Sequence, residues 1–353
     1  MEPGVLLKVK VSYNLLCMPK KLLPGIINDN FIKVQAAFLG ANLIWGAAGA
    51  VIKYTLEYIP PFTFLYLRFL IVCVIVLPIT IYQLKKEPIR KADYLNFFLL
   101  GLFSQTSLIL PFVALKFTSV LDYTIIGVMA SVLTVYAGHY FYKDRINKGM
   151  KTGLVLASLG TILIVLEPML WGNSGAGKVS DRILGNVLGL FYALTWVIYV
   201  IWAKFSMGGK SGALKKTLSF INIKPMSGKY SAATVVLLSF YVGLFTLVPL
   251  AVFENLNMGG ESNFTLLSID INGVVGLLYM AVFSSIVAYW LNHWGLENAK
   301  VSDFAIFGYL APVFALPFAY LILGELPNTL MLVGTVFIAA GVVVAEKNNR
   351  HES

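Results

Sequence analysis

Aromatic and polar side chains share one face of several apolar segments in this sequence. Asn42 and Trp45 lie three residues apart, and Trp196 and Tyr199 repeat that spacing later in the chain, which places each pair on one side of a helix. A surface that faces lipid does not need such a stripe, so we expect these faces to point inward and to line a cavity with indole and phenol walls. In the alternative interpretation, the aromatic residues form interfacial belts and the small polar residues form packing contacts. The predicted substrate-binding residues are Asn42, Trp45, Lys53, Arg68, Ser104, Gln105, Tyr192, Trp196, Tyr199, Ser285, Tyr289 and Asn292.

Two of these residues, Lys53 and Arg68, are cations within apolar segments, where a charge costs about 2.5–3.5 kcal/mol on insertion scales. Lys53 stands near the end of its segment, so its side chain could extend toward the membrane surface. Arg68 stands roughly 12 Å into the next segment, at about 1.5 Å per helical residue. Two roles stay open for Arg68, namely anchoring a substrate anion or pairing structurally with a protein group such as Glu57. Together, Lys53 and Arg68 would attract a carboxylate or a phosphate.

Four titratable side chains are candidates for proton coupling, namely Asp122, Asp303, His139 and His293. Asp122 follows Ser119 in a capping-box pattern, and Asp303 also stands at a helix start, so a structural role as helix caps is the alternative for both. The histidines titrate near neutral pH in water. Both histidines stand toward the ends of their segments, where an interfacial or hydrogen-bonded role is the alternative.

Signatures of catalysis and of nucleotide binding are missing from the sequence. It has no HExxH or G-x-S-x-G motif, and it contains only three histidines and two cysteines. Gly209-Lys210-Ser211 resembles the end of a phosphate loop, but Lys204 occupies the position of the first required glycine. We therefore predict no catalytic residue, no metal, no cofactor and no enzymatic activity. A channel and a membrane-embedded enzyme stay as distant alternatives.

The elements that must position these side chains are membrane-spanning helices. The chain has 58% hydrophobic and 12% charged residues, whereas soluble domains have about 45–50% and about 25%. Apolar runs of about 20 residues, enough to cross the hydrocarbon layer, recur along it. We predict an all-α integral membrane protein with ten transmembrane helices, at 34–55, 60–83, 94–115, 119–141, 149–167, 184–203, 230–253, 271–292, 303–324 and 329–346. The segment 204–229, rich in Lys, Gly and Ser, is predicted to be a mobile loop.

The distribution of basic residues predicts the topology. If the N-terminus is cytoplasmic, 22 of the 27 Lys and Arg residues fall in cytoplasmic segments, and only Lys116, Lys178 and Arg182 fall in external loops. This asymmetry follows the positive-inside rule and places both termini in the cytoplasm. The net charge of +10 is therefore a topology signal with a secondary attraction to anionic lipids. We expect no nucleic-acid partner.

The two halves of the sequence are related. Segment 94–166 aligns with 275–347 without a gap at an offset of 181, and Trp45 and Lys53 have the same spacing as Trp196 and Lys204. Five predicted spans in each half give the halves opposite membrane orientations. Inverted repeats are typical of transporters that work by alternating access around a central site. The polar and glycine matches are Asp122/Asp303, Asn147/Asn328, Gly127/Gly308, Gly153/Gly334 and Gly160/Gly341.

Both halves carry motifs of a known family. The first half contains "NLIWGAAGAVIKYTLEYIPPFTFLYLRF" and "ALKFTSVLDYTIIGVMASVL", and the second contains "GLENAKVSDFAIFGYLAPVFALPFAYLILGEL". These motifs resemble those of EamA-type permeases of the drug/metabolite transporter superfamily. The resemblance implies two inverted repeats of five helices and transport of small organic metabolites, often outward. The first half departs from the pattern at Ser131, where a proline is expected, and at Lys143-Asp144, where Gly-Glu is expected, so it should bend less there than the second half.

These observations together predict a multi-pass permease of the cell (plasma or inner) membrane. The expected function is secondary transport, in the direction of export, of amino acids or related zwitterionic or aromatic compounds. The alternative is an exchanger of organic anions or phosphorylated metabolites. The predicted partners are a small-molecule substrate, membrane lipids and protons as a coupling ion. The predicted regions are a cytoplasmic extension (1–33), a first EamA-type repeat (34–167), an external linker (168–183), a second repeat (184–346) and a cytoplasmic tail (347–353).

Overall fold

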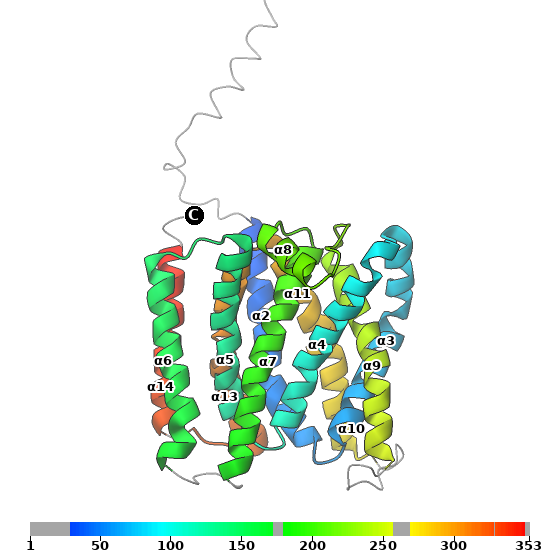
Figure 1. The fold of residues 1–353 in the computed structure, drawn as a ribbon. Coiled ribbons are helices and arrows are strands. Elements are labelled where there is room, and N and C mark those ends of the chain that lie inside the picture. Colours follow the sequence, from blue (N-terminus) through cyan, green and yellow to red (C-terminus); the bar gives the residue numbers. More distant parts are fainter. Residues whose placement is uncertain (1–28, 172–178, 257–268, 328, 350–353) are drawn as a thin grey trace, which may run out of the picture.

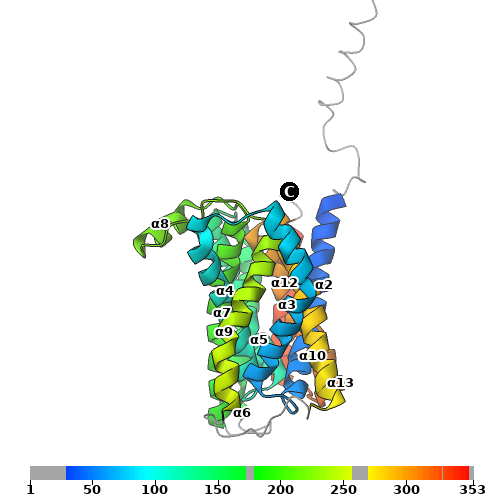
Figure 2. The ribbon, with the colours of Figure 1, turned by 90° about the vertical axis from the view of Figure 1, so that its right-hand side faces the viewer.

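The computed structural model describes residues 29–171, 179–256, 269–327 and 329–349. Every regular element in these ranges is a helix, which confirms the all-helical class. The long helices run side by side along one direction, and the short helix α8 (Gly212–Phe220) lies at one end of the bundle (Figures 1 and 2). The start of α2 (Asp29–Thr55) and the end of α14 (Thr329–Asn349) lie at that same end (Figure 1).

The helices of the first half follow one another with short connections. Pro61 occupies the first turn of its helix, where its missing N–H costs nothing. Ser119 caps the helix that follows it by accepting a hydrogen bond from the backbone of Asp122. The elements are α2 (Asp29–Thr55), α3 (Pro61–Lys86), η1 (Lys91–Asp93), α4 (Tyr94–Ala114), α5 (Val120–Ala137), η2 (Gly138–Tyr142) and α6 (Lys148–Trp171).

The second half repeats this order, with an additional short helix and with one long helix divided in two. Where the first half has the unbroken α5, the second half has two helices that are separated at Tyr309 and Leu310, next to Pro312. The second half is thus interrupted at a point where the helix of the first half continues, and the stronger bend stays a prediction. The elements are α7 (Val179–Ser206), α8 (Gly212–Phe220), α9 (Ala232–Asn255), α10 (Ile271–Tyr279), η4 (Met280–Val287), α11 (Ala288–Asn298), α12 (Val301–Gly308), α13 (Ala311–Leu323) and α14 (Thr329–Asn349).

Length and hydropathy identify membrane spans among the described helices. Seven helical stretches are long and apolar enough to cross a bilayer, and α13 and Thr329–Gly341 of α14 are shorter apolar helices. The chain is therefore a multi-pass membrane protein. The seven stretches are Ile32–Thr55, Pro61–Lys86, Lys91–Ala114, Val120–Tyr142, Ser180–Ser206, Ala232–Asn255 and Ile271–Asn298.

The last helices of the two halves, α6 and α14, form a close pair at one edge of the bundle (Figure 1). Their backbones touch at glycines. A Cβ atom on Gly160 would lie 2.5 Å from the carbonyl oxygen of Gly334, and one on Gly341 would lie 2.6 Å from that of Gly153. Small residues of this kind let membrane helices approach closely enough for backbone contact.

The segment 204–229 differs from the predicted mobile loop. Residues 204–206 complete α7, and Ser211 caps α8 by accepting a hydrogen bond from the backbone of Leu214. Leu214 and Leu218, one helical turn apart, are both buried. The composition of this stretch is that of a loop, but its cap and its apolar spacing are those of a short helix that packs on the bundle.

The loop after α8 is tied to the first half of the chain. The carboxylate of Asp93 accepts hydrogen bonds from the backbone of Ser227 at 2.7 Å and from that of Gly228 at 3.1 Å. It also accepts one from the Tyr230 hydroxyl at 2.6 Å. Glu87 accepts hydrogen bonds from the backbone and hydroxyl of Ser231 at 3.1 and 2.9 Å. Two carboxylates of the first half thus hold the entrance to α9.

Two expected boundaries differ from those in the structure, and three expected regions are described only in part. Helix α2 begins at Asp29 rather than at residue 34. Arg182, expected in an external loop, lies in the first turns of α7, where it is buried. Residues 1–28 of the expected extension, 172–178 of the expected linker and 350–353 of the expected tail lie outside the described residues.

Candidate functional site

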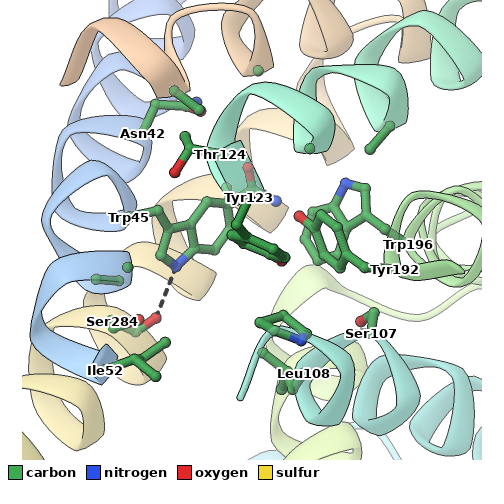
Figure 3. A pocket seen from close by; sticks show the side chains of 18 of the residues that line it. Asn42, Trp45, Ile52, Ser107, Leu108, Tyr123, Thr124, Tyr192, Trp196 and Ser284 are labelled. Carbon is green, nitrogen blue, oxygen red and sulfur yellow. Dashed lines mark hydrogen bonds between the residues drawn. The ribbon is translucent and has the colours of Figure 1, made fainter. Parts of the chain in front are cut away.

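A cavity of about 170 Å³ lies between the two halves. Its walls come from α2, α3, α4 and α5 of the first half and from α7, η4, α11, α12 and α13 of the second. Seven of the predicted residues line it, namely Asn42, Trp45, Arg68, Tyr192, Trp196, Tyr289 and Asn292. Figure 3 shows Trp45, Tyr123, Tyr192 and Trp196 around one common space.

The aromatic wall is a chain of ring contacts that crosses from one half to the other. The ring centroids of Trp45 and Trp196 lie 5.8 Å apart at a nearly perpendicular angle, and those of Trp45 and Tyr289 lie 5.5 Å apart. Tyr192 extends the chain, with its ring centroid 6.3 Å from that of Trp196. Such edge-to-face pairs hold the rings in place. The matched tryptophans of the two repeats therefore meet at the interface of the halves.

The indole of Trp45 is also held by a hydrogen bond. Its Nε1 donates to the backbone carbonyl of Ser284 at 3.1 Å (Figure 3). Ser284 belongs to η4, a π-helical stretch in which the hydroxyl of Ser285 donates to the carbonyl of Met280, five residues back, at 2.9 Å. Turns of this type are frequent at functional sites because they change the direction of side chains and free carbonyls. The wide turn of η4 thus presents both a carbonyl and hydroxyls to the cavity wall.

Arg68 supplies a positive charge to this wall. It is 1% exposed. Its Nε donates to the Ser285 hydroxyl at 2.7 Å, and a terminal nitrogen donates to the Ser284 hydroxyl at 3.4 Å. The centre of the guanidinium group lies 6.0 Å from the ring centroid of Phe112, which also lines the cavity. The structure thus gives Arg68 neutral partners, where a pairing with Glu57 was the structural alternative.

Two amides complete the polar part of the lining. Asn42 donates to the carbonyl of Phe38 in its own helix at 2.8 Å. Asn292 is 1% exposed, and neither its amide nitrogen nor its amide oxygen has a hydrogen-bond partner in the structure. A buried amide without partners carries a desolvation cost that a polar ligand group would remove.

Five predicted residues are near the cavity but do not line it. Lys53 forms a salt bridge with Glu325 at 2.8 Å. Gln105 packs against Gly243 of α9, and a Cβ at that glycine would collide with the Gln105 amide. Ser104, Tyr199 and Ser285 are fully buried behind the wall, where they contact other side chains and helices. Helical spacing places a residue on a face, but a neighbouring helix can cover that face.

The candidates for proton coupling occupy different surroundings. Asp122 is fully buried and forms an ion pair with Arg182 at 2.7 Å. The ring of His139 contacts the backbone carbonyl of Asp144 at 2.7 Å, away from the cavity lining. The side chain of Asp303 lies outside the described residues.

His293 lies directly behind the cavity wall. Its ring stacks on that of Tyr289 with centroids 5.5 Å apart and planes within 11°. One ring nitrogen contacts the Tyr199 hydroxyl at 2.7 Å and the other contacts the carbonyl of Tyr289 at 2.9 Å. It is 1% exposed, and these contacts agree with the hydrogen-bonded role that was one alternative to proton coupling.

The structure adds lining residues that sequence reasoning missed. They include Tyr123, Thr124 and Ser131 of α5 and Ser284 of η4. Tyr123 and Thr124 directly follow Asp122, whose match with Asp303 could have pointed to them. Ser284 precedes a predicted residue, and the π-helical turn brings it to the wall. Among the described residues, no group of three or more His, Cys, Asp or Glu could hold a metal ion.

Known proteins resemble this chain in sequence and in fold. An uncharacterized transporter of Archaeoglobus fulgidus is 26% identical over 85% of this chain and 92% of its own length. A probable amino-acid metabolite efflux pump of Salmonella typhimurium is also 26% identical, over 86% of this chain and 91% of its own length. A crystal structure with 16% identity superposes with a TM-score of 0.61, covering 91% of this chain and 99% of its own, a likeness of fold alone. Residues 33–166 and 211–346 both match the EamA-like transporter family, and the chain belongs to that family.

Proposed function

We propose that this transporter moves small organic metabolites, first of all amino acids or related zwitterionic or aromatic compounds, by alternating access of its two halves. The observation that carries the proposal is the cavity between the halves, whose central contact is the pair of repeat-matched tryptophans, Trp45 and Trp196. An aromatic wall with a few polar groups recognises a molecule that has an apolar body and a polar end. The efflux-pump name of the Salmonella relative supports the substrate class and the outward direction.

The proposed topology has ten spans and both termini in the cytoplasm of a cell whose plasma or inner membrane holds the protein. The supporting observation is that 22 of the 27 Lys and Arg residues fall on one side under this arrangement. The start of α2 and the end of α14 lie at one end of the bundle, together with α8 (Figure 1). With five spans each, the halves would be inverted repeats around a site near the midplane.

A second candidate function is transport of organic anions, and Arg68 favours it. A buried cation in the cavity wall attracts a negatively charged group. A phosphate would carry more charge than this single arginine balances, since the described lining residues include no other Lys or Arg. Carboxylic acids are therefore the anions that fit this alternative.

If transport is coupled to protons, we propose His293 rather than Asp122 as the coupling group. His293 stacks on the cavity residue Tyr289, whereas Asp122 is paired with Arg182. A His293→Gln variant should then transport without the stimulation by an imposed pH gradient that the wild type shows. Equal stimulation of both proteins would remove His293 from this role.

Counterflow in proteoliposomes tests the transport proposal without knowledge of the driving ion. Vesicles loaded with one unlabelled amino acid should accumulate the labelled compound from outside, above empty vesicles. Trp45→Ala and Trp196→Ala should each raise the KM about tenfold, because each removes one of the two facing indole walls. Trp290→Ala is the matched control, since this indole is half exposed on the outer surface of the bundle. Unchanged KM in both cavity variants would remove the tryptophans from the site.

A further inference from the structure

Arg68 differs from two other basic residues of the spans in what neutralises it. Lys53 and Arg182 each have a carboxylate oxygen within hydrogen-bond distance, at 2.8 and 2.7 Å. Arg68 is more deeply buried than either, and both of its hydrogen-bond acceptors are serine hydroxyls. A charge inside a membrane protein is costly unless it is paired, and unpaired ones mark sites for ligands and ions.

The described residues of the cavity lining include no carboxylate that could balance the charge of Arg68. Among the described residues that line it, none is Asp or Glu, and Arg68 is the one cation. The lining as described therefore carries a net charge of +1. A ligand with a single negative charge would neutralise it, whereas a zwitterion would leave the excess charge in place and a cation would double it. Because the walls are apolar, this difference is not screened as it would be in water.

The surroundings of Arg68 also fit the rest of such a ligand. Phe112 lies beside the guanidinium group, and Trp45 and Trp196 line the same cavity. Asn292 offers an amide whose donor and acceptor are both without partners. An apolar or aromatic body would lie against the rings, and a polar substituent would satisfy the amide.

From these observations we propose that Arg68 binds the carboxylate of a small monocarboxylic acid with an aromatic or apolar body, and that no ammonium group is required. The proposal rests on the second candidate function above, transport of organic anions, and names the chemistry of its ligand. Arginine suits this role because its planar fork can present two N–H groups to one carboxylate. Ser284 and Ser285 act as positioning residues that hold the guanidinium group in the wall.

Ligand binding in detergent tests this proposal separately from transport, because no turnover is needed. Quenching or enhancement of intrinsic tryptophan fluorescence is titrated with three compounds that share a phenyl body, namely phenylpropionate, phenylalanine and phenethylamine. The deaminated counterpart of leucine extends the series to an aliphatic body. We expect phenylpropionate to bind at least as tightly as phenylalanine, and phenethylamine to bind at least tenfold more weakly than either.

Substitution of Arg68 then assigns the preference to its charge. Arg68→Gln should weaken phenylpropionate binding at least tenfold and should abolish the discrimination between the acid and the amine. Arg90→Gln is the matched control, because Arg90 is an exposed arginine that contacts the Ser227 carbonyl outside the cavity. If Arg68→Gln does not yield folded protein, Ser285→Ala replaces it; this variant keeps the charge, loses the 2.7 Å contact and should weaken the acid selectively.

Several results would overturn the proposal. In the wild type, these are equal binding of the acid and the amine, or no binding of any acid up to several millimolar. Binding of phenylalanine at least tenfold tighter than that of phenylpropionate, or tighter binding of a phosphate monoester than of phenylpropionate, would also do so. In the folded Arg68→Gln protein, the result is an unchanged preference for the acid. Counterflow measurements separate failure of the proposed role of Arg68 from failure of the transport proposal. Transport of compounds without a carboxylate would keep the function and discard the role of Arg68. Binding of acids without counterflow would keep the site and discard the transport assignment.

Discussion

Lys53 and Lys204 occupy matched positions in the two halves and reach matched partners. The Nζ of Lys53 donates to the carbonyl of Thr118 at 3.1 Å, and that of Lys204 donates to the carbonyl of Ala299 at 2.7 Å. Thr118 and Ala299 are related by the repeat offset of 181. Lys53 also donates to the carboxylate of Glu325, which belongs to the other half, whereas Lys204 completes its contacts with further carbonyls of its own half.

The same contrast extends to the neighbouring contacts at each end of the bundle. At the end where α2 finishes, two ion pairs join the halves, Lys53 with Glu325 and Arg182 with Asp122. At the α8 end, the carboxylate of Asp93 joins the halves by accepting hydrogen bonds from backbone and hydroxyl groups. The comparison teaches that the repeats share their geometry, while the ion pairs of Lys53 and Arg182 join the halves at one end and the Asp93 carboxylate, with its neutral donors, joins them at the other.

The largest effect that would test this comparison is expected from Asp122→Asn. This change removes the carboxylate that Arg182 contacts at 2.7 Å, and loss of one member of a buried pair costs about 3 kcal/mol or more. Thermal unfolding in detergent should show the loss. The double variant Asp122→Asn/Arg182→Gln should recover part of it, because no unpaired charge remains. Additive losses in the double variant would show that the two side chains act independently.

Glu325→Gln should have the next largest effect. Its carboxylate binds Lys53 at 2.8 Å and also accepts from the backbone N–H of Val120 at 3.0 Å. The amide keeps an acceptor for the backbone but loses the ion pair, which is only partly buried, so we expect a cost of about 2 kcal/mol. Glu57→Gln is the control, because Glu57 is an exposed carboxylate near the same end. High salt should shrink the difference from wild type.

Asp93→Asn tests the opposite end. An amide accepts with its oxygen alone, so either the backbone N–H of Ser227 or the donors of Gly228 and Tyr230 lose their acceptor. The expected cost is about 1.5 kcal/mol. Because these donors are neutral, the loss measured by thermal unfolding should be the same at low and high salt. A strong dependence on salt would contradict the difference drawn between the two ends.

Glu87 gives the smallest expected effect, and it appears as a pH dependence. Burial acts to raise the pKa of Glu87, but hydrogen bonds from Thr234, Ser231 and Gln83 outweigh it and hold the pKa below its usual value. The stabilisation is therefore complete above the unfolded pKa, which is about 4.3, and is lost as the pH falls through the folded value. Melting temperatures of wild type and Glu87→Gln should converge on acidification. A constant difference between them down to acid pH would contradict this role.

The fold could be predicted where chemistry and spacing are local. The capping pattern at Ser119 predicted a helix start, and the structure has one there. Lys143, where the family pattern expects glycine, adopts the same left-handed turn as its repeat partner Gly324, with φ of 60° against 67°. The packed fold therefore imposes a backbone conformation that residue type alone disfavours at Lys143. Helix α8 was not predicted because the polar composition of the segment concealed the one-turn spacing of Leu214 and Leu218, which are both buried.

The candidate site was predictable in its aromatic part and less so in its polar part. Trp45 and Trp196 stand out because the repeat matches them within apolar segments. Gln105 has the same helical signature but is covered by α9 at Gly243, and no periodicity within one helix reveals which neighbour covers it. The partner of Arg68 was equally hidden, since Ser285 lies more than 200 residues away along the chain. Contacts between the halves depend on how the repeats dock, which single-segment patterns do not encode.

The glycine contact between α6 and α14 has a consequence for how this molecule arose. Gly160 meets the carbonyl of Gly334, and Gly341 meets that of Gly153; the repeat offset exchanges these two contacts. Such a self-complementary contact is isologous, the kind that joins two identical subunits around a twofold axis. A single gene that encoded one half could therefore have assembled as a homodimer through this helix before duplication fused the two copies. Antiparallel docking of two copies would also require that this ancestor inserted into the membrane in both orientations.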